Sequence, residues 1–152
     1  MQNARENLSR FNRIIKESND VYREAAKAVG LPDCAFWLLY ALRECGEGMT
    51  QSALCDALYQ PKQTVNSAIK KLENEGYLYL CPGPDKRSKL VCLTEQGERL
   101  AQNKIDSLLA AEVRALDSLS EQEQETFLTL FHRYIDALKW ETMRGTEEEE
   151  KI

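Results

Sequence analysis

The chain has 152 residues and a mass of 17.4 kDa, which suits one ordinary domain or one small protomer of a dimer and is too short for two independent cores. Its 20 Lys and Arg against 25 Asp and Glu give a formal charge of −5, which by itself argues against a protein that coats a polyanion. Hydrophobic residues make up 43% and charged residues 30%, so neither intrinsic disorder nor a membrane protein is expected.

Targeting and catalytic signals are missing from the sequence. No run approaches the roughly 18 apolar residues of a spanning helix, and the N-terminus lacks the apolar core of a signal peptide, so we expect a cytoplasmic protein. A single His132 leaves no set of metal ligands and no nucleophile beside a base. We therefore expect no catalytic residue, no metal and no cofactor.

Five cysteines are scattered along the chain without a CxxC pair, each inside an apolar stretch. This pattern favours buried free thiols in a reducing compartment. They are Cys34, Cys45, Cys55, Cys81 and Cys92.

Two helices are predicted at the N-terminus. From Leu8 to Val29 apolar residues recur in alternating steps of three and four, with Ser18 as the one polar member, so this helix requires a partner helix. It should end at Gly30. Pro32 then opens a second helix through Ala41, whose apolar residues surround it and predict burial on most sides.

A pair of short helices is predicted next. Thr50 can cap the first, which runs to about Leu58. Pro61 fits the first turn of the second, which ends near Glu75 because Gly76 supplies a left-handed residue. The two helices have the outline of a helix-turn-helix. The residues of the first helix expected to point inward are Ala53, Leu54, Ala57 and Leu58.

The rest of the chain predicts a hairpin and two further helices. Residues 77–81 and 89–93 are short strand-like runs around a basic seven-residue turn. Thr94 caps a helix with one apolar face, and Ser120 with Glu123 forms a capping box before the last helix. Residues 147–150 are interpreted as a frayed acidic tail. The apolar faces of these two helices comprise Ile105, Leu109, Val113 and Leu116, then Phe127, Phe131, Tyr134 and Leu138.

The helix after Pro61 has one polar face that suits the edges of DNA bases. At about 100° per residue its inner face holds Val65, Ala68, Ile69 and Leu72, and its outer face holds Gln63, Asn66, Ser67, Lys70 and Asn74. Amides can pair with adenine, and Lys can reach guanine or a phosphate. The outer face has no carboxylate, whereas a plain solvated helix usually alternates Glu with Lys. We therefore favour DNA contact over a solvated face.

The turn of the hairpin forms a second basic segment. Lys86, Arg87 and Lys89 lie there, and a basic loop beside such a helix can enter the minor groove. Asp85 is more plausibly a clamp on an Arg or on loop amides than a reactive group. Taken alone, the turn fits a solvated loop equally well. Residues 61–90 contain six cations and three anions, a net charge of +3 that leaves −8 for the remainder.

The order and spacing of these motifs resemble the MarR family of bacterial transcriptional regulators. The resemblance rests on residues 50–54 (TQSAL), 63–73 (QTVNSAIKKLE), Gly76 with Tyr77, 85–89 (DKRSK) and 93–97 (LTEQG). It implies a mainly α fold with a small β-hairpin wing, a winged helix-turn-helix domain joined to a helical dimerisation region. The implied boundaries are 1–30 for the N-terminal dimerisation helix, 31–98 for the DNA-binding domain, 99–145 for the C-terminal dimerisation helices and 146–152 for the acidic tail.

The resemblance also implies a function. A homodimer would bind double-stranded DNA at a pseudo-palindromic operator and act as a repressor, with binding relieved by a small amphipathic or aromatic ligand. Arg87 would enter the minor groove, and Asp85 would hold the wing in shape. The residues expected to contact DNA are Lys62, Gln63, Thr64, Asn66, Ser67, Lys70, Lys86, Arg87 and Lys89.

The sequence also offers candidate ligand-binding residues and two alternative functions. Tyr22, Trp37 and Tyr40 could line a ligand pocket, although aromatic residues at helical spacing are more often plain core. A winged-helix module for protein interaction, with Trp37 or the acidic tail at the interface, is one alternative function. A cysteine-based redox enzyme or sensor is the other. Some relatives sense oxidants through a Cys in the first helix, where this chain has none, so that mechanism does not carry over by position.

Overall fold

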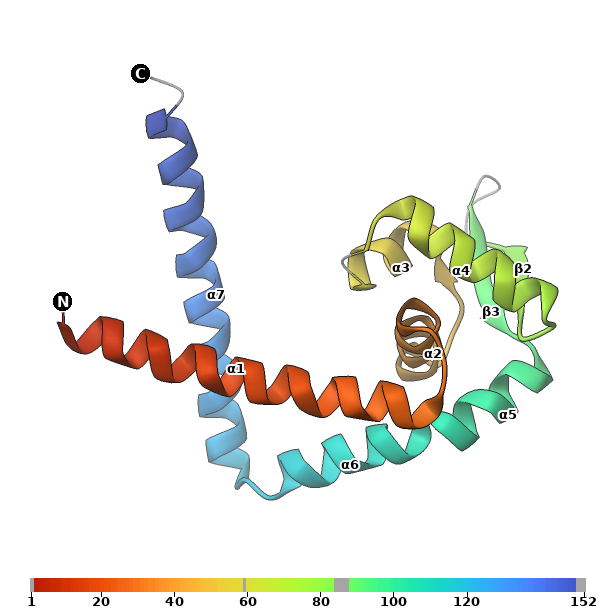
Figure 1. Cartoon of the computed structure of the whole chain (residues 1–152), viewed down its shortest axis with the longest axis horizontal. Helices are drawn as coiled ribbons and strands as arrows, with labels where there is room; N and C mark the ends of the chain where they lie inside the picture. The colour runs from red at the N-terminus through yellow and green to blue at the C-terminus, as the bar shows by residue number, and fades with distance from the viewer. Residues whose placement is uncertain (1, 59, 84–87, 150–152) are drawn as a thin grey trace. The chain divides into compact units, whose positions relative to one another are not determined.

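The computed structural model describes residues 2–58, 60–83 and 88–149 (Figure 1). Its contacts divide the chain into two units, Met1–Leu109 and Ala110–Ile152. The predicted fold class, mainly helical with a small antiparallel sheet, is confirmed. In chain order the elements are α1 (Gln2–Val29), α2 (Asp33–Cys45), β1 (Met49–Thr50), α3 (Gln51–Leu58), α4 (Lys62–Asn74), β2 (Leu78–Pro82), β3 (Lys89–Leu93), α5 (Glu95–Lys104), α6 (Asp106–Asp117) and α7 (Glu121–Glu149).

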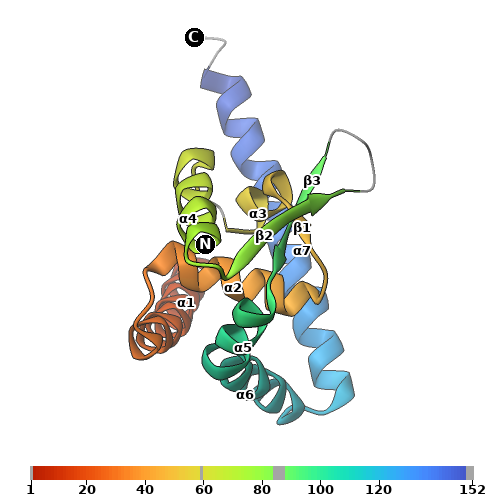
Figure 2. The same cartoon turned by 90° about the vertical axis from the view of Figure 1, so that its right-hand side faces the viewer.

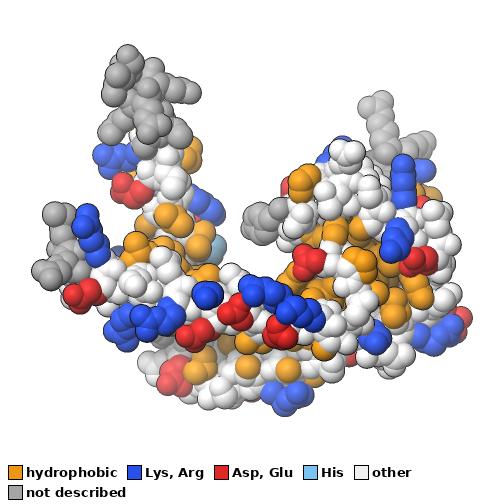
Figure 3. Space-filling model, viewed as in Figure 1, with side chains coloured by type: hydrophobic (Ala, Val, Ile, Leu, Met, Phe, Trp, Pro, Cys, Tyr) orange, Lys and Arg blue, Asp and Glu red, His pale blue; other side chains and the backbone are white. Residues whose placement is uncertain are grey.

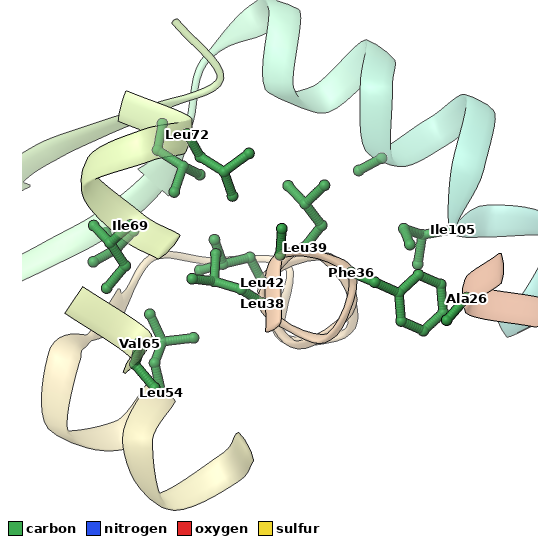
Figure 4. Packing of buried hydrophobic residues seen from close by; sticks show 14 residues of the cluster. Ala26, Phe36, Leu38, Leu39, Leu42, Leu54, Val65, Ile69, Leu72 and Ile105 are labelled. Atoms are coloured by element: carbon green, nitrogen blue, oxygen red, sulfur yellow. The ribbon is translucent and has the colours of Figure 1, made fainter. Parts of the chain in front are cut away.

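The core of the first unit is built around α2. Phe36, Leu38 and Leu39 are completely buried, as the all-round apolar pattern of this helix predicts. Figure 4 shows Leu54 of α3 beside Val65 of α4 on one side of the cluster, with the ring of Phe36 near Ile105 and Ala26 on the other. α2 therefore holds the two short helices and the start of α6 around a single core.

The helix ends follow the predicted signals closely. Gly30 and Gly76 have positive φ of 74° and 81° directly after α1 and the last turn of α4, a region that glycine adopts without a Cβ clash. The backbone N–H of Tyr77 donates to the carbonyl of Leu72 at 2.9 Å, which closes the end of α4 and leads into β2. The side chain of Thr50 accepts from the N–H of Ala53, so the predicted cap of α3 is confirmed.

The sheet contains one strand more than the hairpin pattern predicts. Its order is β1-β3-β2, with Met49 opposite Val91 and Leu80 opposite Val91 on the other side. β1 has only two residues, too few for an alternating pattern, so its pairing depends on the edge that β3 offers. Figure 2 shows β2 and β3 side by side with α3 and α4 beside them.

The helix predicted after Thr94 breaks into two at Ile105. Ile105 has φ −111° and ψ −40° and is completely buried, so the chain turns where this side chain enters the core. Val113 and Leu116 do not share its burial; they are 59% and 38% exposed. The prediction of one continuous helix is wrong, whereas Leu109, Val113 and Leu116 still share one face of α6 at their steps of four and three. Ala57, which was expected to point inward, is exposed as well.

The last helix begins as predicted and continues further. Ser120 and Glu123 exchange the two hydrogen bonds of a capping box, 2.8 Å from the Ser120 N–H and 3.4 Å from the Glu123 N–H. The predicted frayed tail is wrong in part, because α7 stays helical to Glu149; residues 150–152 lie outside the described residues. Along α7 the aromatic side chains Phe127 and Phe131 stack at 6.0 Å yet remain exposed.

Among the described helices none is long and apolar enough on its own to cross a membrane. Only α1 and α2 taken together reach that length and composition, and they are bent by 98° at their junction.

Candidate nucleic-acid interface

The core fixes which face of α4 is available to a partner. Val65, Ile69 and Leu72 are buried against α2 and α3, with exposed fractions of 0–2%. At about 100° per residue the opposite face must then point to solvent. Lys62, Gln63, Thr64, Ser67 and Lys70 are all exposed, as predicted for DNA-contacting residues. Figure 3 shows Lys and Arg side chains in the region of α4, with Asp or Glu side chains beside them.

Asn66 departs from the prediction. It is only half-exposed, and its Oδ1 is buried without a hydrogen-bond partner among the described residues. Its position explains this, because Asn66 lies about 100° from Val65, on the flank of the helix rather than at its crest. The outer face is therefore narrower than predicted, with Gln63, Ser67 and Lys70 at its centre. The Ser67 hydroxyl donates to the carbonyl of Gln63 at 2.9 Å, so its remaining hydrogen-bonding capacity is as an acceptor.

The first turn of α4 carries backbone N–H groups that have no carbonyl partner within the helix itself. Pro61 occupies the cap position and supplies no side-chain cap, while its carbonyl accepts from Thr64 and Val65 at 2.9 and 3.2 Å. The N–H groups of the first turn and the helix dipole together favour an anion at this end. Exposed Lys62 lies in the same turn. The end of α4 that follows the turn of the helix-turn-helix is thus suited to a phosphate.

The wing is anchored at its base by Thr94. The hydroxyl of Thr94 donates to the carbonyl of Gly76 at 2.6 Å and accepts from the N–H of Gly97 at 3.0 Å. These bonds join the end of α4, the sheet and the start of α5. Lys89 is exposed at the first residue of β3. Asp85, Lys86 and Arg87 lie outside the described residues, so their predicted roles stay predictions.

The three aromatic residues named as ligand candidates lie together. Trp37 contacts Tyr22 at 5.4 Å and Tyr40 at 5.5 Å between ring centroids, so α1 and α2 share one aromatic cluster. Two hollows adjoin it, of about 330 and 500 Å³, and both include Asp33, Trp37 and Tyr40 in their lining. The three rings are half-exposed, and although Trp37 and Tyr40 also pack against the core, their exposed sides leave an apolar wall open to a small molecule.

The cysteines are less buried than the sequence predicts. All five are free thiols, and Cys45 is exposed while the other four are half-buried. Cys45 ends α2, where the chain turns out of the core at Gly46. Cys81 and Cys92 lie on neighbouring strands with their Sγ atoms 2.8 Å apart. Only the pairing register of the strands brings these two together, and the spacing along the chain gives no such signal. Among the described residues no group of three or more His, Cys, Asp or Glu could hold a metal ion.

The three-stranded sheet, the short helix pair and the acid-free face of α4 define a winged helix-turn-helix protein. A sequence profile described as the MarR family matches residues 29–88. A regulator of the helix-turn-helix type from Bacillus subtilis (strain 168), YwoH, is 32% identical over 122 residues, which cover 80% of this chain and 85% of that relative. The chain belongs to the MarR family of transcriptional regulators.

Solved structures agree with this fold. NMB1585, a MarR family regulator from Neisseria meningitidis, superimposes with a TM-score of 0.70 at 26% identity, covering 93% of this chain and 96% of that one. The S. aureus MepR in its complex with DNA superimposes with a TM-score of 0.66 at 20% identity, over 82% and 93% of the two chains. The relatives are transcriptional regulators rather than enzymes.

Proposed function

We propose that this regulator is a cytoplasmic homodimer that binds a pseudo-palindromic operator, represses transcription there, and is released by a small amphipathic or aromatic ligand. The observation that carries the proposal is the outer face of α4, where amide, hydroxyl and ammonium groups stand exposed without a carboxylate. The similar fold of S. aureus MepR, which was solved on DNA, supports it. Two such helices in a dimer should meet half-sites about 10 base pairs apart.

Dimerisation is supported by exposed apolar side chains in each of the two units. In α1, Ile14 and Val21 are 62% and 63% exposed, and in α7 four of the predicted apolar positions are 37–54% exposed. Helices with such faces require a partner helix. A second copy of the chain would supply that partner helix. The resulting dimer would have the two-fold symmetry that a palindromic site requires.

The ligand is proposed to bind at the aromatic cluster. Trp37 and Tyr40 line both adjoining hollows and Tyr22 lines the larger one, and each hollow has the volume of a small organic molecule. Because the cluster joins α1 to α2, and α2 packs directly on α4, a ligand there can shift the helix that reads DNA.

Binding of the purified full-length protein to genomic DNA fragments, followed by a gel shift on the selected sites, tests the DNA function. We expect Arg87→Ala and Gln63→Ala to weaken binding to the selected operator, because they remove the minor-groove and base contacts. Arg114→Ala is the matched control, since it removes an exposed cation from α6. Equal binding by wild type and both interface variants would reject the site, and no selected fragment at all would reject the function.

A further inference from the structure

Two thiols face each other across the wing. Cys81 lies in β2 and Cys92 in β3, and their Sγ atoms are 2.8 Å apart, within hydrogen-bond distance and about 0.8 Å longer than a disulfide bond. Both are free and half-buried.

The strand register places both thiols on the face of the sheet away from the core. Tyr79 pairs with Cys92, and Cys81 pairs with Leu90, so the two cysteines are diagonal neighbours on one face. The opposite face carries Leu78 and Val91, which are 3% and 0% exposed. Tyr79, on the cysteine face, is 47% exposed. A small reagent can therefore reach the thiols without opening the core.

Close packing confines Cys92 beside its partner. A Cβ at Gly48 would lie 2.5 Å from the Sγ of Cys92, so the backbone before β1 presses on this side chain. The pKa of Cys92 is raised to about 11, mainly by burial and then by hydrogen bonding and charge interaction with Cys81. A hydrogen bond with Tyr79 acts in the opposite direction and lowers this pKa. Because the backbone at Gly48 lies against Sγ of Cys92 and restricts access to it, Cys81 is the thiol that meets a reagent first.

We propose that Cys81 and Cys92 form a reversible disulfide across the β2–β3 hairpin, made by exchange with a small disulfide oxidant. The Cys81 thiolate attacks one sulfur of the oxidant and expels the other as a thiolate. The Cys92 thiolate then attacks Sγ of Cys81 and expels the second. The protein loses two protons and two electrons, the oxidant becomes two thiols, and the protons are taken up by these leaving groups.

The bond changes the shape of the hairpin. Diagonal neighbours have Cα atoms about 7–8 Å apart, whereas a disulfide usually spans about 4.4–6.8 Å. Closing the bond brings the two sulfur atoms about 0.8 Å nearer and ties β2 to β3 at this point. Both strands lead into the basic turn of the wing, so we infer that oxidation weakens operator binding about fivefold or more. This last step rests on the proposed function.

Trypsin digestion of the full-length protein tests the bond directly. Lys86, Arg87 and Lys89 lie between the two cysteines, so trypsin separates them into peptides 72–86 and 90–99. After incubation with glutathione disulfide and alkylation of free thiols, mass spectrometry should find these two peptides joined, and separate again after reduction. Cys45→Ser, which removes the exposed thiol, should keep the joined product, and Cys92→Ser should stop at a glutathione adduct on Cys81. If wild type treated with glutathione disulfide shows both cysteines alkylated, or shows only a glutathione adduct on Cys81, the proposal is overturned.

Operator binding by the same samples separates this inference from the proposed function. Oxidised wild type should bind at least about fivefold more weakly than reduced wild type, and the oxidised Cys81→Ser variant should bind like its reduced form. Joined peptides with unchanged affinity overturn the effect on DNA. Reduced protein that binds DNA but yields no joined peptides overturns the disulfide alone. Joined peptides in a protein that binds no DNA overturn the proposed function alone.

Discussion

At the scale of single residues, the join between the wing and α5 depends on a close backbone approach at Gly97. A Cβ at this position would overlap the carbonyl oxygen of Tyr77. The N–H of Gly97 also donates to the Thr94 hydroxyl, which in turn holds the carbonyl of Gly76. Backbone cannot move away as a flexible side chain can, so even a methyl group must push α5 off the sheet.

Gly97→Ala should therefore lower the free energy of unfolding by about 1–3 kcal/mol, even though alanine favours helices more than glycine does. Urea denaturation followed by circular dichroism measures this change. Gln96→Ala, at the exposed neighbouring position, should stay within about 0.5 kcal/mol of wild type. Equal midpoints for the two variants would mean that the backbone relaxes without cost.

Gln63 and Lys70 stand exposed on the same face of α4 and are expected to contact different parts of DNA. Lys70→Ala should reduce the slope of log affinity against log salt by about 1, because one phosphate contact is lost. Gln63→Ala should leave that slope unchanged and relax base preference at one position by about 1–3 kcal/mol. Operator titrations at several salt concentrations, on wild-type and single-base variant sites, separate the two effects. The same salt slope in both variants would contradict the assignment.

At the scale of elements, α2 is joined to the α5–α6 junction by one arginine. Arg43 Nε donates to Asp106 Oδ1 at 2.6 Å and Nη2 donates to Oδ2 at 2.7 Å, a bidentate pair. Its Nη1 also donates to Glu98 at 2.7 Å. The hydrogen bond from Arg43 holds the pKa of Asp106 below its usual range. These bonds lie next to Ile105, where the chain turns between the two helices.

Asp106→Asn should destabilise the protein at neutral pH, because it removes the charge that Arg43 faces. The lowered pKa of Asp106 stabilises the folded state above about pH 4, and this contribution fades as pH falls through the folded pKa. The difference in urea midpoint between wild type and variant should therefore shrink from pH 7 toward pH 3. Asp117→Asn, at the exposed far end of α6, is the control. A difference that does not change with pH would place the role of Asp106 outside the ion pair.

The elements that sequence predicts here are those with their own local signals. The caps at Thr50, Ser120 and Gly76 and the apolar faces of α2 and α4 identify most helices. β1 and the break at Ile105 could not be predicted, because distant partners decide them: the edge of β3 for one and the core around Phe36 for the other. The exposed face of α4 follows from periodicity, whereas the meeting of Cys81 with Cys92 follows only from strand register.

At the scale of the whole molecule, the apolar face of α7 predicts that the chain is not a monomer. Phe127 and Phe131 stack on each other while remaining 54% and 38% exposed. Phe131→Asp should shift the protein toward monomer in sedimentation analysis, because a buried unpaired charge at the interface is costly. The same substitution at Arg133, an exposed position toward the other side of the helix, should leave the dimer intact. If the wild-type protein sediments as a monomer, the proposed dimer is wrong.

The distribution of charge gives the acidic C-terminus a testable role. The net charge of −5 combines +3 over residues 61–90 with −8 elsewhere, and DNA responds mainly to charge within a Debye length, about 8–10 Å at ordinary salt. Acidic residues outside the basic surface should therefore discourage loose binding to any sequence. Replacing Glu147, Glu148, Glu149 and Glu150 with Gln should raise affinity for random DNA at low salt, measured by fluorescence anisotropy, and the gain should vanish at high salt. Unchanged affinity for random DNA would mean that these side chains serve only as a solvated end.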